Sequence, residues 1–220
     1  MQVDGKNAVL LKKVGIVGDI HAEDKSFVNA IAFLKSKNCD QVYCTGDLCD
    51  GYGSSENVIR FLIKSEVICV KGNHDLWCLT GEMRDVPGAI KSDNLSRSSL
   101  EYLGQLPYCV TIKTIVGDGL LCHGIIDNVM GKVLEEETDL TLNSSLREYV
   151  NGSYPSIMIN GHSHRRMVKQ IGTKTIINAG TLFRDHSPCV CFINFENRQV
   201  EFNNILNYTV DDRCTEYVEF

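Results

Sequence analysis

The chain has 220 residues, of which 43% are hydrophobic and 23% are charged, and this composition argues against extensive disorder. Its formal net charge of −6 at pH 7 argues against a broad basic surface that would bind nucleic acid. No apolar run approaches the ~20 residues of a membrane span, and the N-terminus lacks the basic-then-apolar order of a secretion signal. We therefore expect one domain over residues 1–220 that is cytoplasmic and has no membrane partner.

The first third of the chain alternates between short apolar runs and amphipathic segments. The apolar runs predict strands over residues 14–17, 41–45 and 67–70. Between them, Ser26 is expected to be the N-cap of a helix that ends at Lys37, and Ser54 or Ser55 is expected to cap a second helix. This alternation predicts parallel strands joined by right-handed helical crossovers.

The rest of the chain is predicted to be richer in strands. Ser98 or Ser99 is expected to cap a helix that ends before Pro107, and residues 135–150 are expected to be partly helical. The Val-Gly-Asp-Gly sequence at residues 116–119 is typical of a hairpin turn. Further strands are expected over residues 109–115, 120–122, 156–160, 167–171, 175–178, 190–195 and 199–204.

Several predicted strands end in short segments that combine glycine with Asp, Asn or His. These segments are Gly18-Asp-Ile-His21, Gly46-Asp-Leu-Cys-Asp50, Gly72-Asn-His-Asp75, His123-Gly124 and Gly161-His-Ser-His164. In parallel α/β sheets, ligands bind at the edge where the carboxyl ends of the strands meet. Nitrogen and oxygen ligands gathered at that edge suit divalent transition metals. Each segment alone is compatible with an ordinary turn, but their joint occurrence after strands predicts a shared metal site.

In this order the segments resemble the pattern of the calcineurin-like metallophosphoesterases, which runs D-x-H, G-D-x-x-D, G-N-H-[DE], H and G-H-x-H. The match spans residues 14–181, and every core position of the pattern is filled. The resemblance implies an α/β fold, a sandwich of two mixed β-sheets flanked by helices. In size the chain is closest to the family's small phosphodiesterases.

The resemblance also implies a cofactor of two divalent metal ions, which could be Mn, Ni, Fe or Zn. The ligands implied for one ion are Asp19, His21 and His164. Those implied for the other are Asn73, His123 and His162, with Asp47 bridging the two ions. A water shared between two such ions is expected to lose a proton near neutral pH and to attack phosphorus as hydroxide.

By the same resemblance, His74 is expected to be the general acid, which would either protonate the leaving oxygen or stabilise the phosphoryl oxygens. A catalytic histidine needs a partner that fixes its tautomer. The protein-phosphatase branch of the family implies that Asp50 is this partner, and Asp75 is the competing candidate because it is adjacent in sequence.

Substrate contacts are expected from Asn73, His74 and Arg184, although a solvated surface role for the arginine stays open. The single tryptophan, Trp77, is expected to pack in the core, with stacking on a base as the alternative. His186 belongs to none of the segments and is expected at the surface.

The substrate class depends on the residue after the second Asp of G-D-x-x-D. Members of the protein-phosphatase branch carry a phosphate-binding arginine there, whereas this chain has Gly51. We therefore expect a small phosphoester substrate, a phosphodiester or a nucleotide-type phosphate. The alternatives are a Ser/Thr protein phosphatase-like phosphomonoesterase and a non-catalytic scaffold with the same fold. The scaffold is disfavoured because the seven ligand positions and His74 are all filled.

Overall fold

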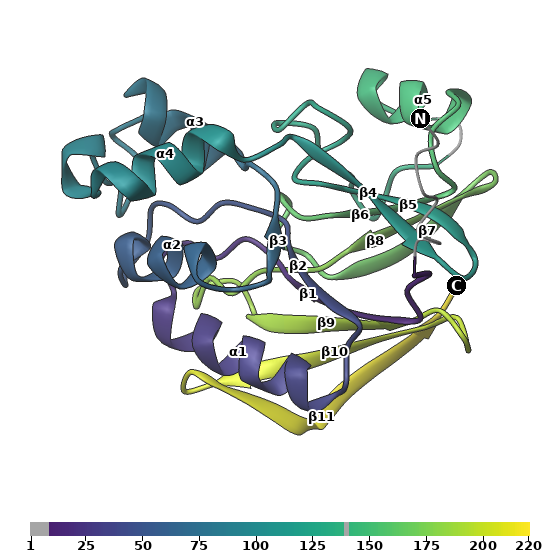
Figure 1. The fold of residues 1–220 in the computed structure, drawn as a ribbon. Helices are drawn as coiled ribbons and strands as arrows, with labels where there is room; N and C mark the ends of the chain where they lie inside the picture. The colour runs from purple at the N-terminus through teal and green to yellow at the C-terminus, as the bar shows by residue number, and fades with distance from the viewer. Residues whose placement is uncertain (1–8, 139–140) are drawn as a thin grey trace, which may run out of the picture.

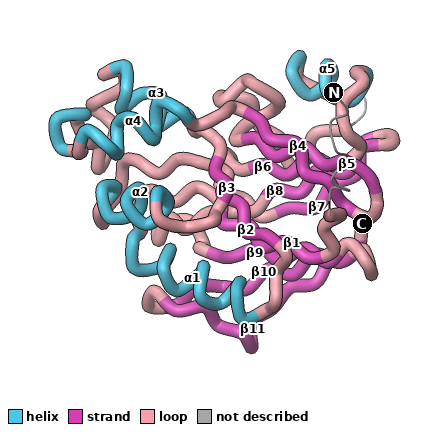
Figure 2. The backbone as a smooth tube through the Cα atoms, in the orientation of Figure 1, coloured by secondary structure: helices cyan, strands magenta, loops and turns pink. Residues whose placement is uncertain are grey.

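The computed structural model describes residues 9–138 and 141–220, with the backbone alone at residues 214 and 215. Its strands form two mixed β-sheets, and helices cover the outer faces (Figure 1, Figure 2). The predicted sandwich of two mixed sheets flanked by helices is confirmed.

The six-stranded sheet has the strand order β11-β10-β9-β1-β2-β3. Its members are β1 (Lys13–Val17), β2 (Gln41–Cys44), β3 (Ile68–Cys69), β9 (Cys189–Asn194), β10 (Gln199–Leu206) and β11 (Thr209–Glu219). The pairs β1–β2 and β2–β3 are parallel, as the strand–helix alternation predicted, while β9, β10 and β11 pair antiparallel with their neighbours. The carboxyl ends of β1, β2 and β3 therefore lie at one edge of the sheet.

The five-stranded sheet has the order β4-β5-β6-β8-β7. Its members are β4 (Cys109–Thr114), β5 (Gly117–Cys122), β6 (Ile157–Asn160), β7 (Met167–Ile171) and β8 (Lys174–Asn178). The pairs β5–β6 and β6–β8 are parallel, and β4 and β7 pair antiparallel at the two edges. The carboxyl ends of β5 and β6 consequently point the same way, which brings the loops after them together.

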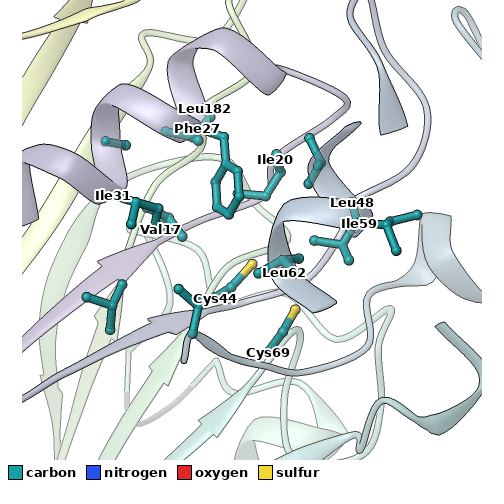
Figure 3. Packing of buried hydrophobic residues seen from close by; sticks show 14 of the residues in the cluster. Val17, Ile20, Phe27, Ile31, Cys44, Leu48, Ile59, Leu62, Cys69 and Leu182 are labelled. Carbon is teal, nitrogen blue, oxygen red and sulfur yellow. The ribbon is translucent and has the colours of Figure 1, made fainter. Parts of the chain in front are cut away.

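The helices are α1 (Asp24–Ser36), α2 (Ser55–Ile63), α3 (Asn73–Thr80), α4 (Arg97–Gln105) and α5 (Ser144–Asn151), with a short 3-10 helix at Ser92–Asn94. Helices α1 and α2 cover the outer face of the six-stranded sheet, where Phe27 and Ile31 of α1 and Leu62 of α2 pack over Val17 and Cys44 (Figure 3). Helix α5 packs on the outer face of the five-stranded sheet. Within the described part of the chain, no helix has both the length and the apolar character that a bilayer crossing requires.

The central strands are buried on both faces. Along β9, Cys191 and Ile193 pack into the layer between the sheets, whereas Val190 and Phe192 pack toward the helices. Strand β6 is also buried on both faces, with Ile159 in the layer between the sheets and Met158 packed on the side of α5. Burial on both faces explains why these strands are continuous apolar runs in the sequence rather than alternating patterns.

Three predicted boundaries are wrong. Helix α1 begins at Asp24 with Glu23 at the N-cap, so Ser26 lies buried in the first turn instead of capping it. The cap of α4 is Ser96, whose hydroxyl accepts the amide of Ser99. The hairpin turn lies at residues 115–116, because β5 already begins at Gly117.

Two further differences concern whole elements. In the span predicted to be partly helical, residues 135–150, the helix occupies only the second part, and residues 139 and 140 lie outside the described residues. Strand β11 was not predicted, because it is an edge strand with the polar sequence Thr-Val-Asp-Asp-Arg-Cys-Thr-Glu-Tyr-Val-Glu. Edge strands can be rich in charge, which removes the apolar signal used to find strands.

Candidate metal centre and active site

The segments singled out in the sequence meet at one edge of the sandwich. Asp19 and His21 follow β1, Asp47 follows β2, Asn73 begins α3, His123 follows β5, and His162 and His164 follow β6. The first five of these side chains are buried, whereas His162 and His164 are partly exposed. The parallel strands are the reason for this convergence, since each strand delivers its ligand types from its carboxyl end.

Asp47 lies between two groups of ligand atoms. His21, Asp47 and His164 offer ligand atoms within 4.8 Å of one another, and so do Asp47, His123 and His162. The same oxygen, Asp47 Oδ2, is 3.6 Å from His21 Nε2 and 3.4 Å from His123 Nε2. A carboxylate common to both groups is the placement that a bridging ligand requires.

Backbone carbonyls set the tautomers of two of the histidines. His21 Nδ1 lies 3.0 Å from the carbonyl oxygen of Asp50, and His123 Nδ1 lies 2.8 Å from that of Thr45. Each Nδ1–H therefore donates, and each Nε2 keeps its lone pair. His123 Nε2 then faces another acceptor, Asn73 Oδ1, at 2.9 Å. Electron-pair donors that face one another without a shared proton repel, and a cation among them removes that repulsion.

Two buried polar atoms of the cluster lack a hydrogen-bond partner among the described residues: Asp19 Oδ2 and His162 Nε2. Asp19 Oδ2 lies 3.6 Å from His164 Nε2, while Oδ1 accepts the hydroxyl of Thr45 at 3.1 Å. Burial and the negative charge of Asp47 raise the pKa of Asp19 well above its usual range. A buried carboxylate oxygen without a partner is costly, so the donor set fits divalent cations.

The two histidines after β6 are neutral at pH 7. Burial, together with the neighbouring imidazole of His123, lowers the pKa of His162 to about 4. Burial and the imidazole of His21 lower the pKa of His164 to about 3. Neutral imidazole is the form that binds a metal.

The backbone at the site is unusual. Four of the predicted ligands have positive φ, a conformation that L-residues rarely adopt: His21 (44°), Asp47 (50°), His162 (65°) and His164 (59°). Such strained positions cluster at functional sites. A glycine before Asn73 lets the backbone at the start of α3 approach the carboxylate of Asp47, since a Cβ on Gly72 would lie 2.1 Å from Asp47 Oδ1.

Asp50 is the residue that contacts His74. His74 Nδ1 lies 2.7 Å from Asp50 Oδ2, and the carboxylate also accepts two N–H groups of Arg84, at 2.9 and 3.0 Å. Burial opposes a charge on His74, but the hydrogen bond to Asp50 and the charge of Asp47 outweigh it and raise the pKa of His74. Arg84 was not found from the sequence, because it lies in an irregular loop without a motif.

The competing candidate, Asp75, has a different set of contacts. Its carboxylate accepts the backbone amides of Leu48, Cys49 and Gly72 at 2.8, 3.2 and 2.9 Å. Burial and the charge of Asp47 raise the pKa of Asp75 to about 7. Asp75 thus ties α3 to the loop after β2 and does not reach the ring of His74 as Asp50 does.

His186 is exposed, as expected, and it also lies against the cluster, a contact that the sequence did not predict. Its Nδ1 is 2.6 Å from His164 Nδ1. The ring of Phe183 supports it, with centroids 5.2 Å apart, and the same ring lies 5.2 Å from that of His21. No sequence spacing links residues 164 and 186, because the contact depends on the conformation of the loop between β8 and β9.

A cavity of about 310 Å³ opens from the cluster, and Asp47, Asn73, His74 and His186 line it together with Trp77, Met130 and Lys132. Trp77 is half-buried, and its ring meets that of His74 at a centroid distance of 4.7 Å and an interplanar angle of 60°. The expectation that Trp77 packs in the core is therefore wrong. Its place on α3, one turn after Asn73, puts it on the cavity wall.

The structure does not bring Arg184 to this cavity. Its guanidinium pairs with both carboxylate oxygens of Glu23, at 2.6 and 2.7 Å, and lies over the ring of Tyr52. Arg166, another arginine near the site, contacts Asn204 and Glu216. Neither arginine is placed as the substrate-phosphate contact that was expected of Arg184.

Comparisons with known proteins agree with the fold and identify the family. The sequence model of the calcineurin-like phosphoesterase superfamily domain matches residues 13–198. Among curated proteins, none matched the chain. Among solved structures, the hypothetical protein PH1004 from Pyrococcus horikoshii OT3 superposes with a TM-score of 0.72 and 15% identity, covering 91% of this chain and 89% of that one.

Two further structures have the same fold. A metallophosphoesterase from Sphaerobacter thermophilus gives a TM-score of 0.66 at 15% identity, covering 89% of this chain and 88% of that one. An archaeal phosphodiesterase gives a TM-score of 0.57 at 15% identity, with coverages of 88% and 99%. At these identities the likeness shows a shared fold. The family match runs from β1 through β9 and contains every candidate metal-binding segment, so the chain belongs to the calcineurin-like phosphoesterase superfamily and is a metal-dependent phosphoester hydrolase.

Proposed function

We propose that the chain hydrolyses a phosphodiester or a nucleotide-type phosphate at a centre of two divalent metal ions. The observation that carries the proposal is the position of Asp47, whose carboxylate is common to both groups of ligand atoms. Two ions that share a bridging carboxylate suit an in-line displacement at phosphorus. A structural neighbour whose name includes phosphodiesterase activity supports the diester class.

In this proposal the protein side chains divide the work. When bound, the ions supply an activated water and neutralise the charge of the phosphoryl group. His74 donates a proton to the leaving oxygen from Nε2, because its Nδ1 is held by Asp50 at 2.7 Å. Asn73 turns Oδ1 toward His123, which leaves its amide N–H groups to contact the phosphoryl oxygens.

The preference for a diester follows from Gly51. A Cβ at this position would lie 1.9 Å from the carbonyl oxygen of His21, so an arginine cannot stand there without moving the backbone of a proposed metal ligand. A phosphomonoester dianion gains more than a diester from the two parallel hydrogen bonds of a guanidinium. Without a guanidinium at residue 51, a phosphomonoester dianion has no binding advantage over a diester at this position.

We therefore expect kcat/KM to be higher for bis-p-nitrophenyl phosphate than for a phosphopeptide. The measurement is a panel of a diester, a nucleotide, a small monoester and a phosphopeptide, run on metal-stripped protein reloaded with manganese, nickel or zinc in turn. A phosphopeptide that exceeds the diester by tenfold, about 1.4 kcal/mol of transition-state binding, would instead favour a protein phosphatase.

His186 is expected to position a metal ligand. For His164 Nε2 to present a lone pair to an ion, its Nδ1 must carry the hydrogen and donate it to His186 Nδ1, 2.6 Å away. His186→Ala removes this acceptor, and we expect metal affinity to fall by about 10- to 100-fold. Calorimetric titration of metal into stripped protein measures the change.

The control is His186→Gln, whose side-chain oxygen can still accept from His164. It should restore part of the lost affinity, whereas His186→Leu, which fills a similar volume without an acceptor, should restore none; equal recovery in the two variants would indicate a purely steric role. Wild-type affinity in His186→Ala would contradict the positioning role.

A further inference from the structure

The cavity in front of the metal cluster has an apolar wall. Trp77 and Met130 line the same cavity of about 310 Å³ as Asp47 and His74. Both side chains are accessible to a ligand, since Trp77 is half-buried and Met130 is 50% exposed. Apolar and aromatic side chains at a concave site beside polar groups are typical of the surfaces on which a ligand packs. The volume is at the small end for ligand pockets, which suits one nucleotide unit and not a polymer.

Trp77 is held at a fixed distance from the proposed chemistry. It follows His74 by three residues on α3, so the two side chains share a face of the helix. The hydrogen bond from His74 to Asp50 fixes the imidazole, and the edge of one ring meets the other at a centroid distance of 4.7 Å. A group attached to a phosphoryl held at His74 therefore lies next to the indole.

The cavity also holds a positive charge. Lys132 lines it and is exposed, and among the residues that the structure describes no acidic side chain forms an ion pair with its ammonium group. The proposed ions account for one phosphoryl group, so Lys132 is available for a second anionic oxygen of the same ligand.

We propose that Trp77 and Met130 bind the nucleobase of a nucleotide ester, whose phosphoryl group lies at the metal cluster and whose further negative charge pairs with Lys132. This inference rests on the proposed function and names its substrate class. A base presents a flat π-face to the indole, and such stacking is tolerant of base identity. A sugar phosphate has no flat aromatic group to stack on this wall.

Trp77 is the only tryptophan of the chain, so its fluorescence reports on this wall directly and without turnover. Zinc-loaded protein is titrated with AMP, with ribose 5-phosphate and with inorganic phosphate. We expect saturable quenching with AMP and little change with the other two ligands, which carry the phosphate but no base. Equal changes with AMP and ribose 5-phosphate, or no response to AMP, would overturn the inference.

Inhibition of bis-p-nitrophenyl phosphate hydrolysis gives a second readout. For Trp77→Leu we expect the inhibition constant of AMP to rise roughly tenfold, while that of ribose 5-phosphate stays unchanged. Trp77→Phe keeps an aromatic face and should retain most of the AMP affinity. If both ligands weaken equally in Trp77→Leu, the residue acts through His74 and not on the base.

These outcomes separate the two proposals. If the protein hydrolyses the diester but AMP does not change the fluorescence of Trp77, the nucleobase proposal is rejected and the phosphodiesterase proposal stands. If AMP quenches the fluorescence but the protein hydrolyses no phosphoester of the panel, the nucleobase proposal stands and the proposed reaction is rejected.

Discussion

Asp47→Asn is expected to empty both metal positions at once. The carboxylate oxygen lies 3.6 Å from His21 Nε2 and 3.4 Å from His123 Nε2, so one substitution removes negative charge from both groups of ligands. An amide is neutral and offers one oxygen in place of two. Elemental analysis after loading and dialysis should show clearly fewer than two ions per chain, and hydrolysis should fall with them.

The matched control is Asp185→Asn, the same change at an exposed carboxylate that contacts the hydroxyl of Tyr52. It should keep wild-type metal content. Circular dichroism of both variants checks that the fold is intact. Wild-type metal content and rate in Asp47→Asn would show that Asp47 does not bridge the ions.

His74→Gln is expected to lower kcat by roughly 10²–10⁴-fold, the contribution of a general acid, with metal content unchanged. His74 contacts Asp50, and in this proposal it carries the proton and ligates no ion. The loss should be smaller for p-nitrophenyl esters than for alkyl esters, since p-nitrophenolate leaves without protonation. Steady-state kinetics on a series of leaving groups measures this dependence.

Asp50→Asn serves as the companion variant, because it weakens the orientation of the ring and keeps the ring itself. It should show a smaller loss with the same dependence on the leaving group. If His74→Gln loses the same factor with good and poor leaving groups, His74 positions the phosphate and does not act as the acid.

Much of the site could be anticipated because its residues follow strands. Apolar runs that end in Gly-Asp or His-Gly, taken together, indicate the carboxyl ends of parallel strands, and parallel strands bring those ends together. Asp19, Asp47 and His123 were placed in this way, each after a strand that the apolar pattern had found. The local sequence was therefore enough to predict both the strand and the position of the ligand residue that follows it.

The residues that the sequence did not place depend on loop conformation or on exposure. His186 reaches His164 through a loop whose path no spacing encodes, and Arg84 reaches Asp50 from an irregular segment. Trp77 looked like a core residue because a large aromatic side chain is usually buried. Its position follows from the register of α3, which begins at Asn73 and puts residue 77 on the same face as His74.

The most direct test of the shared carboxylate is a metal titration in which binding and activity are measured on the same samples. Metal-stripped protein is reloaded stepwise with manganese, and the bound ion and the hydrolysis of bis-p-nitrophenyl phosphate are determined at each step. The two ligand groups that meet at Asp47 predict two ions per chain and activity that reaches its maximum only as the second ion binds. Saturation at one ion per chain, or full activity with one ion bound, would contradict this account.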